Sequence, residues 1–121
     1  QIVVNAHRIN QGEMPHIEVV SNVPKTDCLG LNAPDPEAGI QGIKDLLTDL
    51  VPTLGYNPVR DVQVLAPSRR GKAGTRTLNQ ELQALLNPPQ PGRAELVRGG
   101  TTLRVGDRMT LDRRTACQYL G

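Results

Sequence analysis

The near absence of aromatic side chains constrains this chain more than any other feature of its sequence. Its 121 residues include two tyrosines, Tyr56 and Tyr119, and neither Phe nor Trp. A hydrophobic core must therefore consist of aliphatic side chains. A platform on which several bases stack requires several aromatic rings, so the composition excludes that kind of nucleic-acid site. A chain of this length has room for one domain, with a core that needs neither metal nor disulfide.

Cysteine content and hydropathy predict a cytoplasmic protein that does not contact a membrane. The two cysteines, Cys28 and Cys117, are too few for a secreted disulfide framework and lack the spacing of a zinc site. No apolar run approaches the roughly 20 residues of a membrane helix, and the first residues do not resemble a secretory leader. The chain opens with an apolar run after Gln1 and without Met, which is typical of a piece cut from a longer polypeptide.

Basic and acidic residues are unevenly distributed along the chain. Residues 1–59 carry three basic and seven acidic side chains, for a net charge of −4, whereas residues 60–121 carry eleven and five, for a net charge of +6. An asymmetry of this kind is typical of a domain with one side that faces a polyanion. A basic surface that only interacts with solvent would have the same composition, so charge alone leaves both interpretations open.

Three segments have the spacing and the boundary residues of helices. The clearest begins with Asp35 as N-cap and Pro36 in the first turn, continues with Ile and Leu at intervals of three and four residues, and ends near Pro52. A second amphipathic helix is expected over residues 75–86. A third is expected over residues 2–10, because a glycine and then a proline follow it.

Short apolar runs between these helices predict strands. We expect extended segments at residues 17–20 and 28–31, a central strand at residues 62–65, and a hairpin made of residues 94–97 and 102–105. Strands that alternate with helices favour an α/β fold in which helices flank a parallel sheet. The short β-hairpin lies near the C-terminus of this fold.

The loop that precedes the 75–86 helix is the best candidate for a binding site. It gathers four basic residues, Arg69, Arg70, Lys72 and Arg76. In an open α/β sheet, loops at the carboxyl ends of strands face the ligand crevice, and the N-terminus of the next helix adds a positive potential. Together with the Ser68 hydroxyl and backbone amides, these groups suit phosphate oxygens and predict contact with nucleic acid. The alternative is a solvated basic loop.

A second polar cluster lies on the helix expected at residues 2–10. Asn5, His7 and Arg8 could reach one strand of a ligand, although their spacing also fits an ordinary exposed helix face. His7 and His16 lack the partners of a metal site or a catalytic triad. The sequence has no Walker A phosphate loop, no nucleophile elbow and no HExxH zinc helix. We therefore assign no catalytic, cofactor-binding or metal-binding residue.

Three segments resemble the RecD/TraA family of superfamily 1 DNA helicases. The first runs from Ile2 to Pro15 and contains Asn-Ala-His-Arg-Ile-Asn. The second runs from Val62 to Gly71 and is followed by Leu78-Asn79 and by Leu85-Leu86-Asn87-Pro88. The third runs from Arg104 to Met109. In order and spacing they are similar to the first half of the second RecA-like motor domain in helicases of the exodeoxyribonuclease V alpha-subunit type.

The resemblance implies a partial RecA-like motor domain over residues 1–92, followed over residues 93–121 by the hairpin and the start of an insertion or divergent tail. It implies a parent enzyme that hydrolyses ATP with Mg²⁺ to move along single-stranded DNA in recombination and repair. The P-loop and the Mg-binding motif belong to the family's first motor domain, and the arginine that reaches the γ-phosphate would precede Ile2. We therefore expect this chain to contribute part of the ATP cleft between the domains, while alone it binds no cofactor and is inactive.

The resemblance also implies partners: single-stranded DNA, the remaining helicase domains and other subunits of a recombination nuclease complex. Residues Ser68 to Arg70 match the region that touches the single strand, and the polar cluster of the first helix follows the arginine motif. Two departures from the family pattern stand out. Residues 110–121 do not match it, and Gly30 replaces a bulky aromatic residue, which predicts a gap beside that strand.

Two other functions are compatible with the sequence. The acidic helix that begins at Asp35 could dock on another protein, which would make the chain a protein-interaction module. The outer face of that helix is charged and lacks the aromatic and Met side chains of an interface core, which weakens this reading. An inactive helicase remnant would fit the divergent C-terminal residues.

Overall fold

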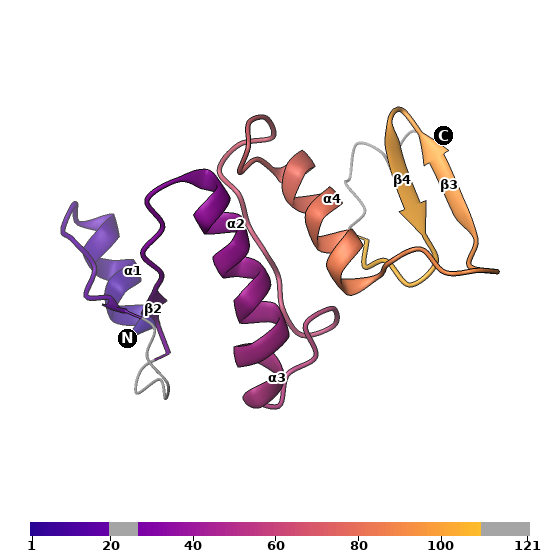
Figure 1. Ribbon diagram of the computed structural model, residues 1–121. Helices are drawn as coiled ribbons and strands as arrows, with labels where there is room; N and C mark the ends of the chain where they lie inside the picture. The colour runs from indigo at the N-terminus through magenta and orange to yellow at the C-terminus, as the bar shows by residue number, and fades with distance from the viewer. Residues whose placement is uncertain (20–26, 110–121) are drawn as a thin grey trace, which may run out of the picture. The chain divides into compact units, whose positions relative to one another are not determined.

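The computed structural model describes residues 1–19 and 27–109, and it contains both helices and strands (Figure 1). The elements are α1 (Ile2–Asn10), β1 (Glu18–Val19), β2 (Leu29–Gly30), α2 (Pro36–Asp45), the π-helical η1 (Leu46–Leu50), α3 (Val51–Thr53), α4 (Thr75–Leu86), β3 (Glu95–Arg98) and β4 (Thr101–Arg104). The chain forms two compact units, and the second begins at Ile43. A mixture of helices and strands agrees with the α/β class that the sequence predicts.

The first unit is organised around the buried side chain of Asn5. Its amide nitrogen donates to the His16 carbonyl at 2.7 Å, and its amide oxygen accepts the His16 backbone N–H at 2.9 Å. Gln1 donates to the same oxygen from one turn earlier. These bonds tie α1 to the segment that leads into β1. Helix α1 ends at Asn10, as its flanking glycine predicts.

Strands β1 and β2 pair in parallel, with Glu18 opposite Leu29 and Val19 opposite Gly30. A Cβ atom on Gly30 would lie 2.3 Å from the Cγ2 methyl of Ile17. The predicted gap beside Gly30 is therefore wrong, because the Ile17 side chain occupies the space that a larger residue would need. Residues 20–26 and 110–121, which include part of the predicted 17–20 strand and the divergent tail, lie outside the described residues.

The sheets in the structure are much smaller than the parallel sheet that the sequence predicts. Within residues 1–19 and 27–109, parallel pairing is confined to the two residues of β1 and the two of β2. Residues 62–66 are extended and alternate between half-buried and exposed, as a strand would, but no ladder joins them to another described strand. The prediction of a central strand at 62–65 is wrong for this part of the chain, because an extended backbone becomes a strand only when a neighbour pairs with its N–H and C=O groups.

The β-hairpin matches its prediction within one residue. Strands β3 and β4 are antiparallel, with Glu95 opposite Arg104 and Arg98 opposite Thr101. Gly99 and Gly100, which join them, both have positive φ angles. A two-residue turn that follows the twist of a hairpin needs positive φ at both positions, and glycine adopts this conformation without steric cost.

Helix α2 continues without interruption through η1 into α3, so the helix predicted from Asp35 to the region of Pro52 is present. The Asp35 carboxylate accepts the Ala38 backbone N–H at 2.7 Å, the capping bond that the sequence predicts. Pro52 lacks an N–H and its ring crowds the carbonyl four residues earlier. The helix widens in the turn before it, where the Val51 amide reaches the Leu46 carbonyl.

The aliphatic core is small. Leu47 in η1 and Leu78 in α4, with 3% and 6% of their surfaces exposed, are the buried apolar side chains of the described residues. Other large apolar side chains are open to solvent, including Val3 at 68% and Leu65 at 85%. The sequence predicts a larger core, because apolar periodicity marks a face that can be buried but does not supply the surface that covers it.

We expect Leu78→Ala to lower the free energy of unfolding by about 2–4 kcal/mol, because it leaves a cavity at one of the two buried leucines. Urea unfolding followed by circular dichroism measures this change. Leu96→Ala is the matched control, since Leu96 is 59% exposed, and should change the free energy by less than about 0.5 kcal/mol. Equal losses in the two variants would contradict a core centred on Leu78.

Candidate functional site

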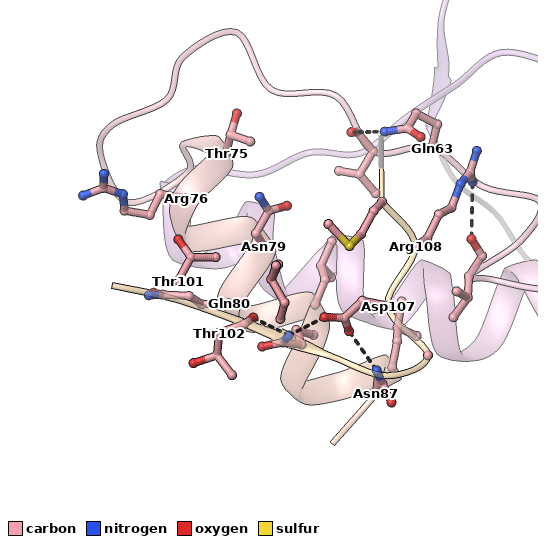
Figure 2. Close-up of a pocket in the computed structure, with 18 of the residues that line it drawn as sticks. Gln63, Thr75, Arg76, Asn79, Gln80, Asn87, Thr101, Thr102, Asp107 and Arg108 are labelled. Atoms are coloured by element: carbon pink, nitrogen blue, oxygen red, sulfur yellow. Dashed lines mark hydrogen bonds between the residues drawn. The ribbon is translucent and has the colours of Figure 1, made fainter. Parts of the chain in front are cut away.

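The second unit contains a cleft of about 880 Å³ (Figure 2). Helix α4 supplies one side. The rest comes from η1, the 58–64 segment, residues 69–70, β4 and the residues on either side of β4. Four arginines line it: Arg69, Arg70, Arg76 and Arg108. Uncharged polar side chains also line it, namely Gln63, Thr75, Asn79, Gln80, Gln83, Asn87, Thr101 and Thr102. The cleft thus brings together three of the basic residues that the sequence predicts for a binding site.

Three of these arginines have guanidinium groups that are not used by the described part of the protein. Arg69, Arg70 and Arg76 are exposed, and their side chains make no hydrogen bond or ion pair with any described residue. Other arginines of this unit differ, since Arg60 pairs with Asp61 at 3.0 Å and Arg104 pairs with Glu95 at 2.6 Å. No carboxylate in the described part of the chain therefore pairs with Arg69, Arg70 or Arg76 at the cleft.

The basic loop folds tightly against the start of α4. The Thr75 and Arg76 amides donate to the carbonyls of Ser68 and Arg69 at 2.9 and 3.4 Å. Gly74 is buried, and a Cβ atom there would lie 2.5 Å from the Arg70 carbonyl oxygen. Only glycine permits this approach of the two backbone segments. The loop geometry thereby fixes the positions from which Arg69 and Arg70 extend.

The same geometry changes the role expected for Ser68 and for the helix N-terminus. The Ser68 hydroxyl donates to the Arg70 carbonyl at 2.8 Å, and the Thr75 hydroxyl donates to the Ser68 carbonyl at 3.1 Å. Because these hydroxyls and the first amides of α4 bond to the loop itself, they brace it. A phosphate at this cleft would be held by guanidinium groups. Lys72 is exposed and lies outside the cleft lining.

The three candidates on α1 belong to the first unit and have different surroundings. Asn5 is 3% exposed and its amide is occupied by the His16 and Cys28 contacts, so the structure gives it a structural role. Arg8 donates to the Met14 carbonyl at 2.8 Å and pairs with Glu13 at 3.1 Å. His7 is exposed. The sequence placed these three on one face because helical spacing does not reveal which side chain is turned inward.

Sequence reasoning missed the importance of Asp107, which it treated as part of a tight turn. The Asp107 carboxylate accepts hydrogen bonds from the Gln83 and Asn87 side chains at 2.7 and 2.8 Å and from the Arg104 backbone N–H at 2.8 Å. Figure 2 shows the Asp107 carboxylate beside the Asn87 side chain. The contact therefore fastens the end of the β-hairpin to α4. In the sequence, the only sign of this residue's role is the Gly-Asp-Arg run after a predicted strand. That run predicts a turn but does not show which helix residues the Asp107 carboxylate contacts.

Arg108 makes a second attachment. Its guanidinium donates to the carbonyls of Val59, Arg60 and Val62 at 3.3, 3.2 and 2.8 Å. These carbonyls lie at the end of a short turn, where a cation compensates partial negative charge. Together, Asp107 and Arg108 connect the hairpin to both α4 and the 59–62 segment. They fix the walls of the cleft.

No family model and no solved structure matches this chain. Within residues 1–19 and 27–109, no group of three His, Cys, Asp or Glu side chains is arranged to hold a metal ion. Among the same residues, no helix has both the length and the apolar character needed to cross a membrane.

We expect Gly74→Ala to open the basic loop, because the added methyl would overlap the Arg70 backbone. The free energy of unfolding should fall by about 1–3 kcal/mol, and trypsin should cleave faster after the arginines of the loop. Gly39→Ala is the control, since its Cβ would lie 3.7 Å from Ala33 and alanine favours a helix. Unchanged cleavage in Gly74→Ala would contradict the tight loop packing.

The Asp107 contacts predict a pH dependence of stability. Burial raises the pKa of the Asp107 carboxyl. A larger opposite effect comes from the hydrogen bonds that it accepts from Asn87, the Arg104 amide and Gln83, together with the Arg104 charge, so its pKa lies below the ordinary value. A carboxyl group whose pKa is lower in the folded state stabilises that state at pH values above its ordinary pKa. This stabilisation is lost as the pH falls through the folded-state pKa.

We therefore expect Asp107→Asn to lower the free energy of unfolding by about 1–3 kcal/mol at pH 7. The difference from wild type should shrink as the pH falls below the ordinary carboxyl range. Comparing the two proteins matters because the pKa of Asp61 is also lowered, mainly by its hydrogen bond from Arg60. Denaturant unfolding at several pH values measures the effect, and a pH-independent difference would argue against the role of the Asp107 charge.

Proposed function

We propose that this chain binds single-stranded DNA through the arginine cleft, as part of the second motor domain of a RecD/TraA-type superfamily 1 helicase. The observation that carries the proposal is the convergence of Arg69, Arg70 and Arg76, all without ionic partners among the described residues, on one cleft. The resemblance of residues 2–15, 62–71 and 104–109 to that helicase family supplies the biological context.

Phosphodiester groups are the ligand chemistry that fits this cleft. Guanidinium groups bind phosphate oxygens with two parallel hydrogen bonds, and they retain their charge at all physiological pH values. Among the residues that the structure describes, the one carboxylate in the cleft lining is Asp107, which already accepts three hydrogen bonds. Repulsion of a polyanion by free carboxylates is thus small there. No aromatic side chain of the described residues lines the cleft, so phosphate contacts rather than stacking would supply most of the affinity.

In this proposal, ATP hydrolysis belongs to the parent enzyme. The chain would contribute DNA contacts and part of the cleft between motor domains, where the parent binds ATP and Mg²⁺, and would not hydrolyse ATP alone. Its partners would be the remaining helicase domains and the subunits of a cytoplasmic recombination complex.

A second candidate is a protein-interaction module. The observation that favours it is the exposure of aliphatic side chains on α1, where Ile2, Val3, Val4 and Ile9 are all more than half exposed. Exposed aliphatic side chains at the start of a helix suit contact with another protein or a neighbouring domain. This role concerns the first unit, and it is compatible with DNA binding by the second.

We expect Arg69→Ala with Arg70→Ala to weaken binding of a fluorescently labelled single-stranded oligonucleotide, as measured by anisotropy over a salt series. Each lost phosphate contact should reduce the slope of log K against log salt by about 0.7, so the double variant should lose about 1.4. Duplex DNA, included for comparison, should bind more weakly.

The matched control is Arg60→Ala with Arg98→Ala, which removes the same net charge at two arginines that do not line the cleft. This control should retain nearly all of the wild-type slope. Equal losses in both double variants would mean that net charge, and not the cleft, determines binding. A wild-type slope in the Arg69 and Arg70 variant would show that these two arginines do not contact DNA phosphates.

A further inference from the structure

We infer that the cleft contacts the bases of a bound strand as well as its phosphates, through a row of uncharged side chains made of Asn79 and Gln80 on α4 and Thr101 and Thr102 on β4. This inference rests on the proposed function and deepens it. It assigns the row a role that is separate from the arginines, and it predicts a part of the affinity that does not depend on salt.

On α4, the uncharged row follows directly after Arg76, the last basic residue at the cleft on this helix. Arg76, Asn79 and Gln80 are separated by three and four residues, so they share one face of α4, and all three line the cleft. In Figure 2 they follow one another along the helix, with Thr101 and Thr102 of the hairpin at the same cleft. Four residues of helix cover about 6 Å, so one nucleotide could place its phosphate at Arg76 and its base at the amides.

The amides of this row are available for a ligand. The side chains of Asn79 and Gln80 are exposed and form no hydrogen bond with any described residue, and the hydroxyls of Thr101 and Thr102 form none either. The next side-chain amides along the chain, those of Gln83 in α4 and of Asn87 just after it, already have partners. Gln83 donates to Asp107 and to the Thr102 carbonyl, and Asn87 donates to Asp107. All of these side chains line the cleft, but Gln83 and Asn87 are bonded to the hairpin and to Asp107, whereas Asn79 and Gln80 have no bond to a described residue.

The chemistry of the free groups matches base edges better than phosphates. A carboxamide offers a donor and an acceptor side by side, as the edge of a base does, and a hydroxyl offers both on one atom. A phosphate presents acceptors only, which the arginines already match. Amides that rotate can pair with different bases, so the row predicts contact with bases without strong preference for one of them.

The two kinds of contact have different salt dependences. Arginine–phosphate contacts displace counterions, whereas hydrogen bonds between neutral groups do not. Loss of the amides should therefore lower the affinity by the same factor at every salt concentration. Loss of the arginines should change the slope itself. This difference allows one assay to separate the inference from the proposed function.

The experiment measures anisotropy over a salt series for the full chain with a labelled oligothymidylate and with an abasic oligonucleotide of equal length. The test variant is Asn79→Ala with Gln80→Ala. Asn32→Ala with Gln90→Ala is the matched control, because these exposed side chains lie outside the cleft lining. Arg69→Ala with Arg70→Ala is measured in parallel.

We expect the abasic strand to bind wild type roughly three- to tenfold more weakly than oligothymidylate, as the loss of one or two neutral hydrogen bonds would produce. The Asn79 and Gln80 variant should lose a similar factor for oligothymidylate, keep the wild-type slope, and no longer distinguish the two strands. The Asn32 and Gln90 control should behave as wild type.

Two results would overturn the inference: equal binding of both strands by wild type, or an equal loss for both strands in the Asn79 and Gln80 variant. If the Arg69 and Arg70 variant loses slope while base removal has no effect, the proposed function stands and this inference fails. If that variant keeps both its affinity and its slope, the proposed function fails. The abasic comparison uses unaltered protein, so its outcome does not depend on whether a variant folds.

Discussion

The attachment of the hairpin through Asp107 and Arg108 is the constraint on which the second unit depends. The Asp107 carboxylate accepts the side-chain amides of Gln83 in α4 and of Asn87 just after it, and also a backbone amide. Arg108 donates to three carbonyls of the 59–62 segment. Since only Leu47 and Leu78 are buried apolar side chains in the described residues, hydrophobic packing alone does not determine how these elements meet. Charge-assisted hydrogen bonds, which are directional, determine the arrangement instead.

The candidate site consists of polar side chains that form no bond within this arrangement, next to others that do. Arg104 and Gln83 are engaged by neighbours, whereas Arg69, Arg70 and Asn79 have no side-chain bond to a described residue. A solvated basic loop would have the same composition, but it would not place its arginines at a cleft shared with a hairpin. The position of Arg69, Arg70 and Arg76 at one cleft is the observation that charge alone does not provide.

The two proposals describe one surface with two complementary kinds of contact. Arginines bind phosphates regardless of sequence, and rotatable amides with both a donor and an acceptor pair with varied bases. A motor that moves along a single strand requires contacts that tolerate every sequence, so both properties suit the helicase context. The exposed aliphatic side chains of α1 would offer a separate contact for a neighbouring domain or protein.

The sequence by itself determined the local elements: the start of the long helix at Asp35, the bounds of α4, and the hairpin at Gly99–Gly100. It also identified the basic loop at residues 68–76. These features depend on capping, periodicity and turn geometry, which involve residues close together in the chain. The tertiary structure alone decided that residues 62–66 have no described strand partner, that Asn5 is turned inward, and that Asp107 bonds to α4. Each of these depends on a contact between segments far apart in the sequence, and a pattern of residue types shows which groups can bond but not which partner each one meets.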